Sequence, residues 1–236
     1  MLIGILQTGQ APRDLLADHG DYPAMFARLL ATDDVEFKSW HVEGMEFPGS
    51  VHDADGWLIT GARHGVYEDH PFIPPLEAFV RAAFDAEVPV VGICFGHQIM
   101  AQALGGRVAR FSGGWAIGPQ EYDFGGRALV MNAWHQDQVM EPPPGAEVIA
   151  QNDFCRYAGL SYGSRGLSVQ AHPEFTDGFI SGLIDTRGRG VVPDTQLERA
   201  RAQLGEPLDS DLVAQWIIGF FRSATAAKGV RDVRVD

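Results

Sequence analysis

The sequence predicts an α/β protein with a central, mostly parallel sheet. Short apolar runs alternate with helical patterns through the first hundred residues, which is typical of βαβ units. The most apolar run, residues 88–93, has the length of a buried strand and leads directly into a helical pattern. Beyond residue 107, short β runs separated by Gly and Pro indicate additional strands, some of them antiparallel, beside the parallel set.

The first half of the chain supplies four predicted strands and three predicted helices. Met25, Phe26 and Leu29 recur at helical spacing, and Leu76 and Val80 do so in a second segment. Proline lacks a backbone N–H, so the proline of the 88–93 run is expected at the start of its strand. In chain order we expect strand 2–7, helix 22–32, strand 36–42, strand 57–60, helix 74–86, strand 88–93 and helix 95–104.

The second half is first rich in strands and then helical. The charged tail, residues 228–236, is expected to be frayed. We find no internal repeat, low-complexity tract or linker, and we therefore expect a single domain over residues 1–236 with a C-terminal helical extension. The elements expected in this half are strands 121–124, 128–132, 147–151 and 166–170, followed by helices 195–204 and 212–222.

Composition and charge exclude several classes of protein. The chain is 45% hydrophobic and 21% charged, as in an ordinary globular protein, and its net charge of -13 opposes binding to nucleic acid or an anionic membrane surface. Two cysteines are too few for a disulfide framework and fit a reducing compartment. No signal peptide is visible, and no apolar run approaches the ~20 residues that span a bilayer. We expect a cytoplasmic protein.

The most informative motif is Gly-Ile-Cys-Phe-Gly at residues 92–96. A buried strand enters this turn and a helix leaves it, which is the arrangement of a nucleophile elbow with Cys94 at its apex. The partial positive charge at a helix N-terminus favours a thiolate over a thiol. Alone, the motif leaves two interpretations open, because a free cysteine is commonly a small buried hydrophobe.

A second motif, His-Pro-Glu at residues 172–174, supplies a candidate base. The residue before proline is pushed out of the α region, so His172 is expected in extended backbone, where positions i and i+2 project to the same side. His172 and Glu174 can then form a hydrogen bond, which leaves the other imidazole nitrogen free to take a proton from Cys94. Alone, this motif is typical of a solvated turn.

Together these motifs resemble those of class I glutamine amidotransferases, the type with a Cys-His-Glu triad. Residues 92–98, Gly-Ile-Cys-Phe-Gly-His-Gln, carry the first match, and residues 169–175, Val-Gln-Ala-His-Pro-Glu-Phe, carry the last. Between them, Trp-His-Gln-Asp-Gln-Val at 134–139 resembles the Ser-His-x-Asp-x-Val segment of that family. The resemblance implies a three-layer α/β/α, flavodoxin-like fold with the site at the carboxyl ends of the strands.

The resemblance also implies the chemistry. Cys94 would attack the γ-amide of glutamine or of a related γ-glutamyl compound, giving a γ-glutamyl thioester and releasing ammonia or an amine. His172 would serve as base and then acid, with Glu174 orienting it. The oxyanion would lie between the backbone N–H of Phe95 and one from the turn at Gly61 and Ala62.

Further residues are assigned to the substrate by the same resemblance. Gln98 would help to hold it, the loop Gly113, Gly114 and Trp115 would bind the glutamine backbone, and His135 would shape the rim or support His172. The family implies no cofactor. We also expect no metal, because the histidines and cysteines show no pair at close ligand spacing and because His64 and His70 are expected at the surface of a loop.

Two segments depart from the usual pattern of the family. Many members carry Gly-Gly or Gly-Ser followed by Pro and Ser in the oxyanion loop, whereas residues 60–65 are Thr-Gly-Ala-Arg-His-Gly. Asn-Ala-Trp at 132–134 also replaces the more usual residues. Both changes bear on the shape of the pocket and on which γ-glutamyl compound fits.

Several functions remain open at this point. With no Gly-rich phosphate loop or acidic metal cluster visible, we expect a stand-alone hydrolase. It could pass ammonia to a separate synthase subunit, or it could be a self-contained γ-glutamyl peptidase that uses water. A non-catalytic regulatory module is disfavoured because all three triad residues are present, and related cysteine-elbow peptidases and chaperones generally lack His-Pro-Glu. Cys155 has no elbow or adjacent base and is expected to be structural.

Overall fold

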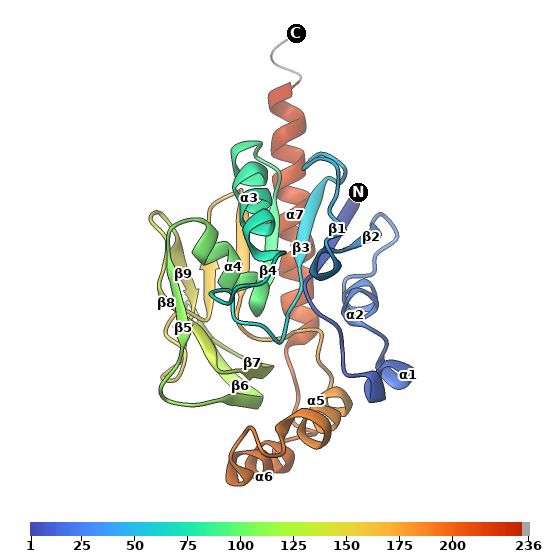
Figure 1. Ribbon diagram of the computed structural model, residues 1–236. Coiled ribbons are helices and arrows are strands. Elements are labelled where there is room, and N and C mark those ends of the chain that lie inside the picture. Colours follow the sequence, from blue (N-terminus) through green and yellow to red (C-terminus); the bar gives the residue numbers. More distant parts are fainter. Residues whose placement is uncertain (233–236) are drawn as a thin grey trace.

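A seven-stranded sheet forms the centre of the computed structural model, which describes residues 1–232 (Figure 1). The first five strands in its spatial order are parallel, and the last two are antiparallel to their neighbours. Side by side, the strands are β2 (Glu36–His41), β1 (Leu2–Gln7), β3 (Gly56–Ile59), β4 (Val90–Ile93), β11 (Gly166–Val169), β10 (Gly159–Ser161) and β9 (Glu147–Ala150).

Four strands lie outside the central sheet. β5 (Arg107–Arg110) pairs with β8 (Asp137–Glu141), and β6 (Ala116–Phe124) pairs with β7 (Arg127–His135). The β6 and β7 segments were expected as additional strands beside the parallel set, and they form a hairpin of their own, joined by single antiparallel bridges, Asp123 to Gln151 and Asn132 to His172, to the segments that follow β9 and β11. They pair with each other because Gly125 and Gly126, at φ 63° and 94°, close the tight two-residue turn of a hairpin.

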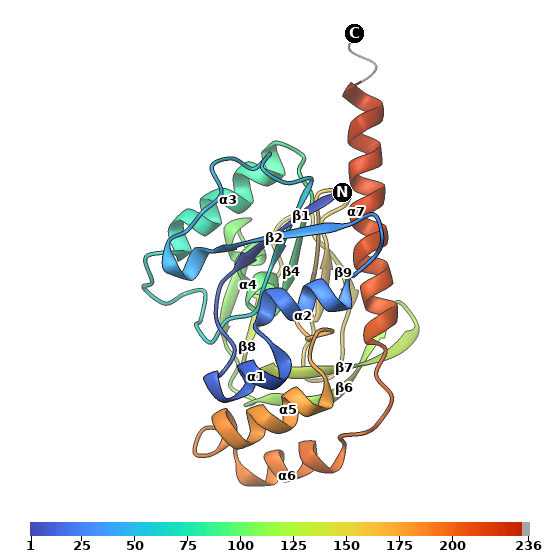
Figure 2. The ribbon, with the colours of Figure 1, turned by 90° about the vertical axis from the view of Figure 1, so that its right-hand side faces the viewer.

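Helices cover both faces of the sheet, so the expected three-layer arrangement is confirmed. Figure 2 shows α3 on one side of the sheet and α7 on the other. The two largest apolar clusters fill the two interfaces, one under α3 and α4 and the other under α2 and α7. The helices are η1 (Arg13–Leu15), α1 (Leu16–His19), α2 (Tyr22–Leu29), η2 (Val42–Gly44), α3 (Ile73–Asp85), α4 (Phe95–Ala103), α5 (Asp177–Leu183), η3 (Ile184–Gly188), α6 (Asp194–Ala202) and α7 (Ser210–Asp232).

The predicted helices are present, with changes at their ends. α2 stops at Leu29, three residues earlier than expected, and α5 was not predicted. α7 runs to Asp232, so helix occupies residues 228–232, where we expected a frayed tail; residues 233–236 lie outside the described part. Among the described residues, none of the helices has the length and apolar character needed to cross a bilayer.

The topology brings separate parts of the chain to one edge. Because β1, β3, β4 and β11 are parallel, the residues that follow them meet at the carboxyl end of the sheet. α5 and α6 lie at this end of the molecule (Figure 1). A third apolar cluster, which includes Leu15, Phe175, Phe179 and Leu197, packs these helices against the first part of the chain.

Candidate active site

Cys94 occupies the turn between β4 and α4, where it is 6% exposed. Its backbone has φ 54° and ψ -102°, a conformation that side chains other than glycine rarely adopt. A Cβ on Gly92 would lie 2.4 Å from the carbonyl oxygen of Gly96, and a Cβ on Gly96 would lie 2.3 Å from that of Ile59. Only glycine fits at both positions, so the sharp turn depends on them and holds Cys94 in a strained conformation.

Hydrogen bonds hold the backbone of Cys94 on both sides of the residue. The Cys94 N–H donates to the carbonyl of Val169 at 2.9 Å, and its own carbonyl accepts from the N–H of Gln98 at 3.1 Å. The first bond joins the turn to β11 and the second begins α4. The partial positive charge of the helix N-terminus favours an anion at this position.

His172 and Glu174 form the contact that the sequence predicted. Nδ1 of His172 lies 2.7 Å from Oε1 of Glu174, and both side chains are almost fully buried. The N–H of His172 donates to the carbonyl of Asn132 at 2.8 Å, which ties it to β7. The imidazole also stacks on Phe175 with ring centroids 3.9 Å apart. The ring is therefore held on one edge and one face.

The electrostatics of His172 favour the imidazolium. Burial acts to lower the pKa of His172, but the charges of the Glu174 carboxylate and of the Cys94 sulfur beside it outweigh burial and raise that pKa to about 10. Oε2 of Glu174 is buried with no hydrogen-bond partner among the described residues. A positive charge on the imidazole between two acidic groups compensates for burying them.

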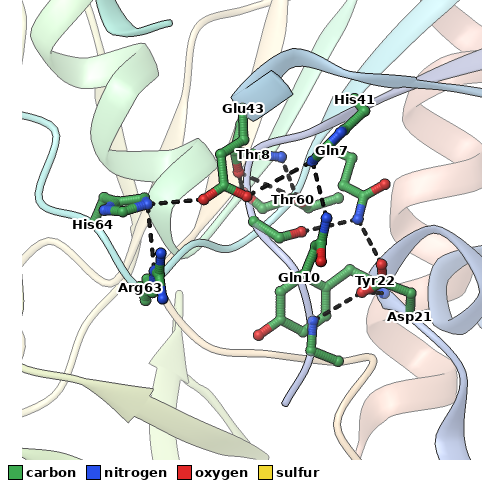
Figure 3. Close-up of polar contacts among 12 residues, drawn as sticks. Gln7, Thr8, Gln10, Asp21, Tyr22, His41, Glu43, Thr60, Arg63 and His64 are labelled. Carbon is green, nitrogen blue, oxygen red and sulfur yellow. Dashed lines mark hydrogen bonds and ion pairs between the residues drawn. The ribbon is translucent and has the colours of Figure 1, made fainter. Parts of the chain in front are cut away.

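Gly61 lies against the side chains of His172 and Cys94. A Cβ at this position would be 2.9 Å from Cε1 of His172 and 3.8 Å from Cβ of Cys94. Its carbonyl accepts from the hydroxyls of Thr8 and Thr60, each at 3.1 Å, and the Thr8 N–H donates to the Thr60 hydroxyl (Figure 3). These bonds across β1 and β3 hold the turn that the sequence analysis assigned to the oxyanion. Thr8 was not predicted to take part.

Cys94 and His172 open on a cavity of about 360 Å³. Of the other residues proposed from the sequence, Gly61, Ala62, Gln98, Trp115 and His135 also line it. Glu174, Phe95, Gly113 and Gly114, which were also proposed, are not among the described residues of its wall.

The structure limits what two wall residues can offer. Nε2 of Gln98 donates to the carbonyl of Asp137 and to Oε1 of Gln170, so only its oxygen remains for a ligand. His135 is buried, and this burial, followed by the nearby charge of His172, lowers its pKa to about 3. Its neutral ring has Nδ1 near the carbonyl of Asp137 at 3.2 Å, and Nε2 has no partner among the described residues.

Much of the remaining wall was missed by the sequence analysis. Three arginines from separate segments line the cavity: Arg63 after β3, Arg110 at the end of β5 and Arg187 in η3. Their clustering carries no local sequence signal, because each comes from a different part of the fold. Arg63, His64, Gly65 and Trp134 lie in the two segments that were expected to bear on the shape of the pocket. The wall residues with no such expectation, besides Arg110 and Arg187, are Gln10, Pro12, Tyr22, Tyr67, Glu68, Gln136, Asp137, Phe175, Leu183 and Val191.

Two expectations outside the triad have different outcomes. Cys155 is 1% exposed and belongs to the apolar core, as expected of a structural residue. His64 was expected at the surface, but its side chain is only 13% exposed, because it packs against His70 and Phe72. His64 also meets Glu68, four residues further along the same loop, and Glu43, which lies 21 residues earlier in η2.

The fold and the site define a glutamine amidotransferase-type enzyme. Residues 25–179 match the sequence profile described as glutamine amidotransferase class-I. The chain therefore belongs to the class I glutamine amidotransferase family. A solved structure described as a glutamine amido transferase from Methylobacillus flagellatus shares the fold, with a TM-score of 0.73 and 19% identity over 94% of each chain.

Curated relatives point to two kinds of enzyme. Gamma-glutamyl peptidase 4 of Arabidopsis thaliana is 30% identical over 71% of this chain and 73% of its own length. A glutamine-hydrolysing GMP synthase of Vibrio vulnificus is 29% identical over 91% of this chain, but the match covers only 44% of the synthase. The relatives thus include a gamma-glutamyl peptidase and, over part of its length, a glutamine-hydrolysing GMP synthase.

Proposed function

We propose that this protein hydrolyses the γ-amide bond of a γ-glutamyl compound through a thioester on Cys94. The observation that carries the proposal is that Cys94 lies beside His172 and His172 contacts Glu174, with Cys94 and His172 both lining the cavity. A thiol at a helix N-terminus, beside an imidazolium held by a carboxylate, is an activated nucleophile.

In the first step the Cys94 thiolate attacks the γ-carbonyl carbon of the substrate. A carbon–sulfur bond forms, and the carbonyl oxygen becomes an oxyanion that the N–H groups of Phe95 and of the turn at Gly61 and Ala62 would stabilise. His172 then gives its proton to the departing nitrogen, the carbon–nitrogen bond breaks, and ammonia or an amine leaves. Each oxyanion donor is worth about 3 kcal/mol in enzymes of this kind of chemistry.

In the second step water replaces the amine. His172, now neutral, takes a proton from the water, whose oxygen attacks the thioester carbon. The carbon–sulfur bond breaks, which releases the γ-carboxylate product and restores the thiolate and imidazolium. Glu174 keeps Nδ1 of the ring engaged throughout, so Nε2 faces the reacting atoms in both steps.

The cavity favours a leaving group larger than ammonia. Its volume of about 360 Å³ falls within the range of sites for small organic ligands. Its wall combines Trp115, Trp134 and Val191 with three arginines, which suits an amine that carries both apolar and anionic groups. Together with the similarity to a γ-glutamyl peptidase, this supports a self-contained γ-glutamyl peptidase over a simple glutaminase.

The test is glutamate release by the purified protein from glutamine and from a panel of γ-glutamyl dipeptides. We expect turnover of dipeptides to exceed that of glutamine and to disappear in Cys94→Ala. Equal turnover by Cys94→Ala would overturn the mechanism. Preference for glutamine would overturn the choice of a peptidase but leave the thioester chemistry in place.

A second candidate is a glutaminase subunit that passes ammonia to a separate synthase, supported by the match to part of a GMP synthase. Such a subunit would show no turnover of the panel on its own. Cys94 would still be alkylated selectively by a glutamine-analogue electrophile, and this combination would favour the synthase partner.

A further inference from the structure

The loop that follows Gly61 brings three metal-ligating side chains together. Oε2 of Glu68 lies 2.8 Å from Nε2 of His70 and 3.7 Å from Nδ1 of His64. One ligand atom from each residue can be chosen so that all three lie within 4.8 Å of one another, and the two imidazole centroids are 4.0 Å apart. The turn at residues 65–70 therefore brings the imidazoles of His64 and His70 to the carboxylate of Glu68.

A second carboxylate fixes the orientation of one imidazole. Oε1 of Glu43, in η2, lies 2.9 Å from Nε2 of His64 (Figure 3), whereas Glu68 is near the other ring nitrogen, Nδ1. Nε2 of His64 thus has an acceptor, and Nδ1 is left to present a lone pair towards Glu68. A carboxylate behind a histidine, selecting the nitrogen that faces the ion, is the usual outer support of a metal-bound imidazole.

Glu43 is itself linked by polar contacts to residues at the end of β2 and after β1. Oε2 of Glu43 lies 3.8 Å from Nε2 of His41, at the end of β2, and that nitrogen is 3.2 Å from the amide nitrogen of Gln10. Figure 3 shows this row of side chains running from the segment after β1 to the loop after β3. The Nε–H of Arg63 also donates towards His64 Nε2 at 3.5 Å, a much longer contact than the 2.9 Å between that nitrogen and Glu43, so we assign the proton of Nε2 to the bond with Glu43.

We propose that His64, Glu68 and His70 bind a divalent transition-metal ion, with zinc the best match to two imidazoles and one carboxylate. Three protein ligands leave one position of a four-coordinate ion for water or for a group of a bound ligand.

The distances in the cluster fit this proposal with small movements. At metal–ligand bonds of ~2.0–2.1 Å, neighbouring ligand atoms of a tetrahedral site lie ~3.4 Å apart. The separations of 3.7 Å and 2.8 Å bracket that value. His70 and Glu68 are partly exposed, at 31% and 45%, so rotation of their side chains can supply the adjustment.

The position of the cluster gives such an ion a role in the site. His64 and Glu68 line the same cavity as Cys94, and their loop begins at Gly61, which packs against His172. A bound ion would fix the loop at the cavity mouth and would attract an anionic group of a ligand. The inference does not depend on the proposed hydrolysis, because the residues are separate from the triad.

The test is metal binding by untagged protein in a Cys94→Ala background, which removes a competing thiol. Zn²⁺ binding is measured by calorimetry and Co²⁺ binding by visible absorption, which reports four-coordinate geometry. We expect one ion per chain, binding weakened ~100-fold or more in His64→Ala and His70→Ala, and ~10–100-fold in Glu43→Gln. The matched control is His52→Ala, an exposed histidine outside the cluster.

Circular dichroism of each variant separates lost binding from lost folding, and Glu68→Gln adds a variant that keeps the size of the side chain. Unchanged affinity in His64→Ala and His70→Ala would overturn the proposal, as would an equal loss in His52→Ala. A failure to bind either ion would also overturn it.

Discussion

The surroundings of Cys94 and Cys155 differ far more than their burial does. Cys94 is 6% exposed and Cys155 is 1% exposed. Cys94 starts α4 and meets His172, whereas Cys155 lies in the connection between β9 and β10, with its backbone N–H donating to Oδ1 of Asn152 at 2.7 Å. Burial raises the pKa of the Cys155 thiol to about 12.

The comparison teaches that two cysteines of similar burial can have quite different neighbours, so burial alone does not distinguish a candidate nucleophile from a structural cysteine. Cys155 is surrounded by apolar core, whereas Cys94 lies at the N-terminus of α4 beside the imidazole of His172.

The largest difference should appear when each cysteine is replaced by alanine. Cys94→Ala is expected to lower kcat/KM by about 10⁴-fold or more, because no other group can form the thioester. Cys155→Ala should leave turnover nearly unchanged. Glutamate release from the best γ-glutamyl substrate measures both, and a comparable loss in the two variants would contradict the assignment.

Glu174→Gln tests whether the charge of Glu174 keeps the pKa of His172 high in spite of burial. The variant keeps the shape of the side chain but removes the charge that raises the pKa of His172, so that pKa should fall. We expect kcat to drop about 10²–10⁴-fold. The imidazolium is the proton donor to the leaving amine, and it is lost as the pH rises through its pKa, so the alkaline limb of the pH profile should move to lower pH. An unmoved limb would exclude His172 as that donor.

Alkylation compares the two thiols without a substrate. Iodoacetamide should modify Cys94 faster than Cys155 by a factor on the order of 10² or more at neutral pH, because the thiolate is the reactive form. Mass spectrometry of the peptides gives both rates in one sample. Similar rates in the folded protein would show that the environment of Cys94 provides no activation.

Stability measurements test the turn that holds Cys94. Gly92→Ala is expected to destabilise the protein by about 3 kcal/mol or more, because the new Cβ would lie 2.4 Å from a backbone oxygen. Gly219→Ala, in α7, meets nothing within 4 Å and should stabilise the helix by about 0.5–1 kcal/mol. Urea unfolding gives the free energy of unfolding of both variants. Similar changes in the two would show that the turn at Gly92 tolerates a Cβ.

The placement of Cys94, His172 and Glu174 could be predicted, because the sequence signals for these three residues are local. The glycines around Cys94 and the spacing of His172 and Glu174 each lie within a few residues, and backbone geometry converts them directly into contacts. Strands β1 and β4 were likewise found from continuous apolar runs, close to their observed bounds.

The walls could not be predicted, because they depend on which segments meet. Arg187 reaches the cavity through a packing of α5 and α6 that has no local signature. β5, β8 and β10 were missed since they are three to five residues long and partly polar. The contact of His64 with Glu43 joins the loop after β3 to η2, and the two residues are 21 positions apart in the sequence. The roles of the triad, like the single-domain boundary, stay predictions.

The place of β11 between β4 and β10 has a consequence for synthesis of the chain. A nascent chain that has emerged only as far as α4 contains Cys94 and its turn, but neither Val169, which accepts the Cys94 N–H, nor His172. The exposed edge of β4 has no partner until residues 166–169 arrive. The ribosome therefore delivers Cys94 well before His172, and the two side chains can meet only when the last parallel strand is inserted.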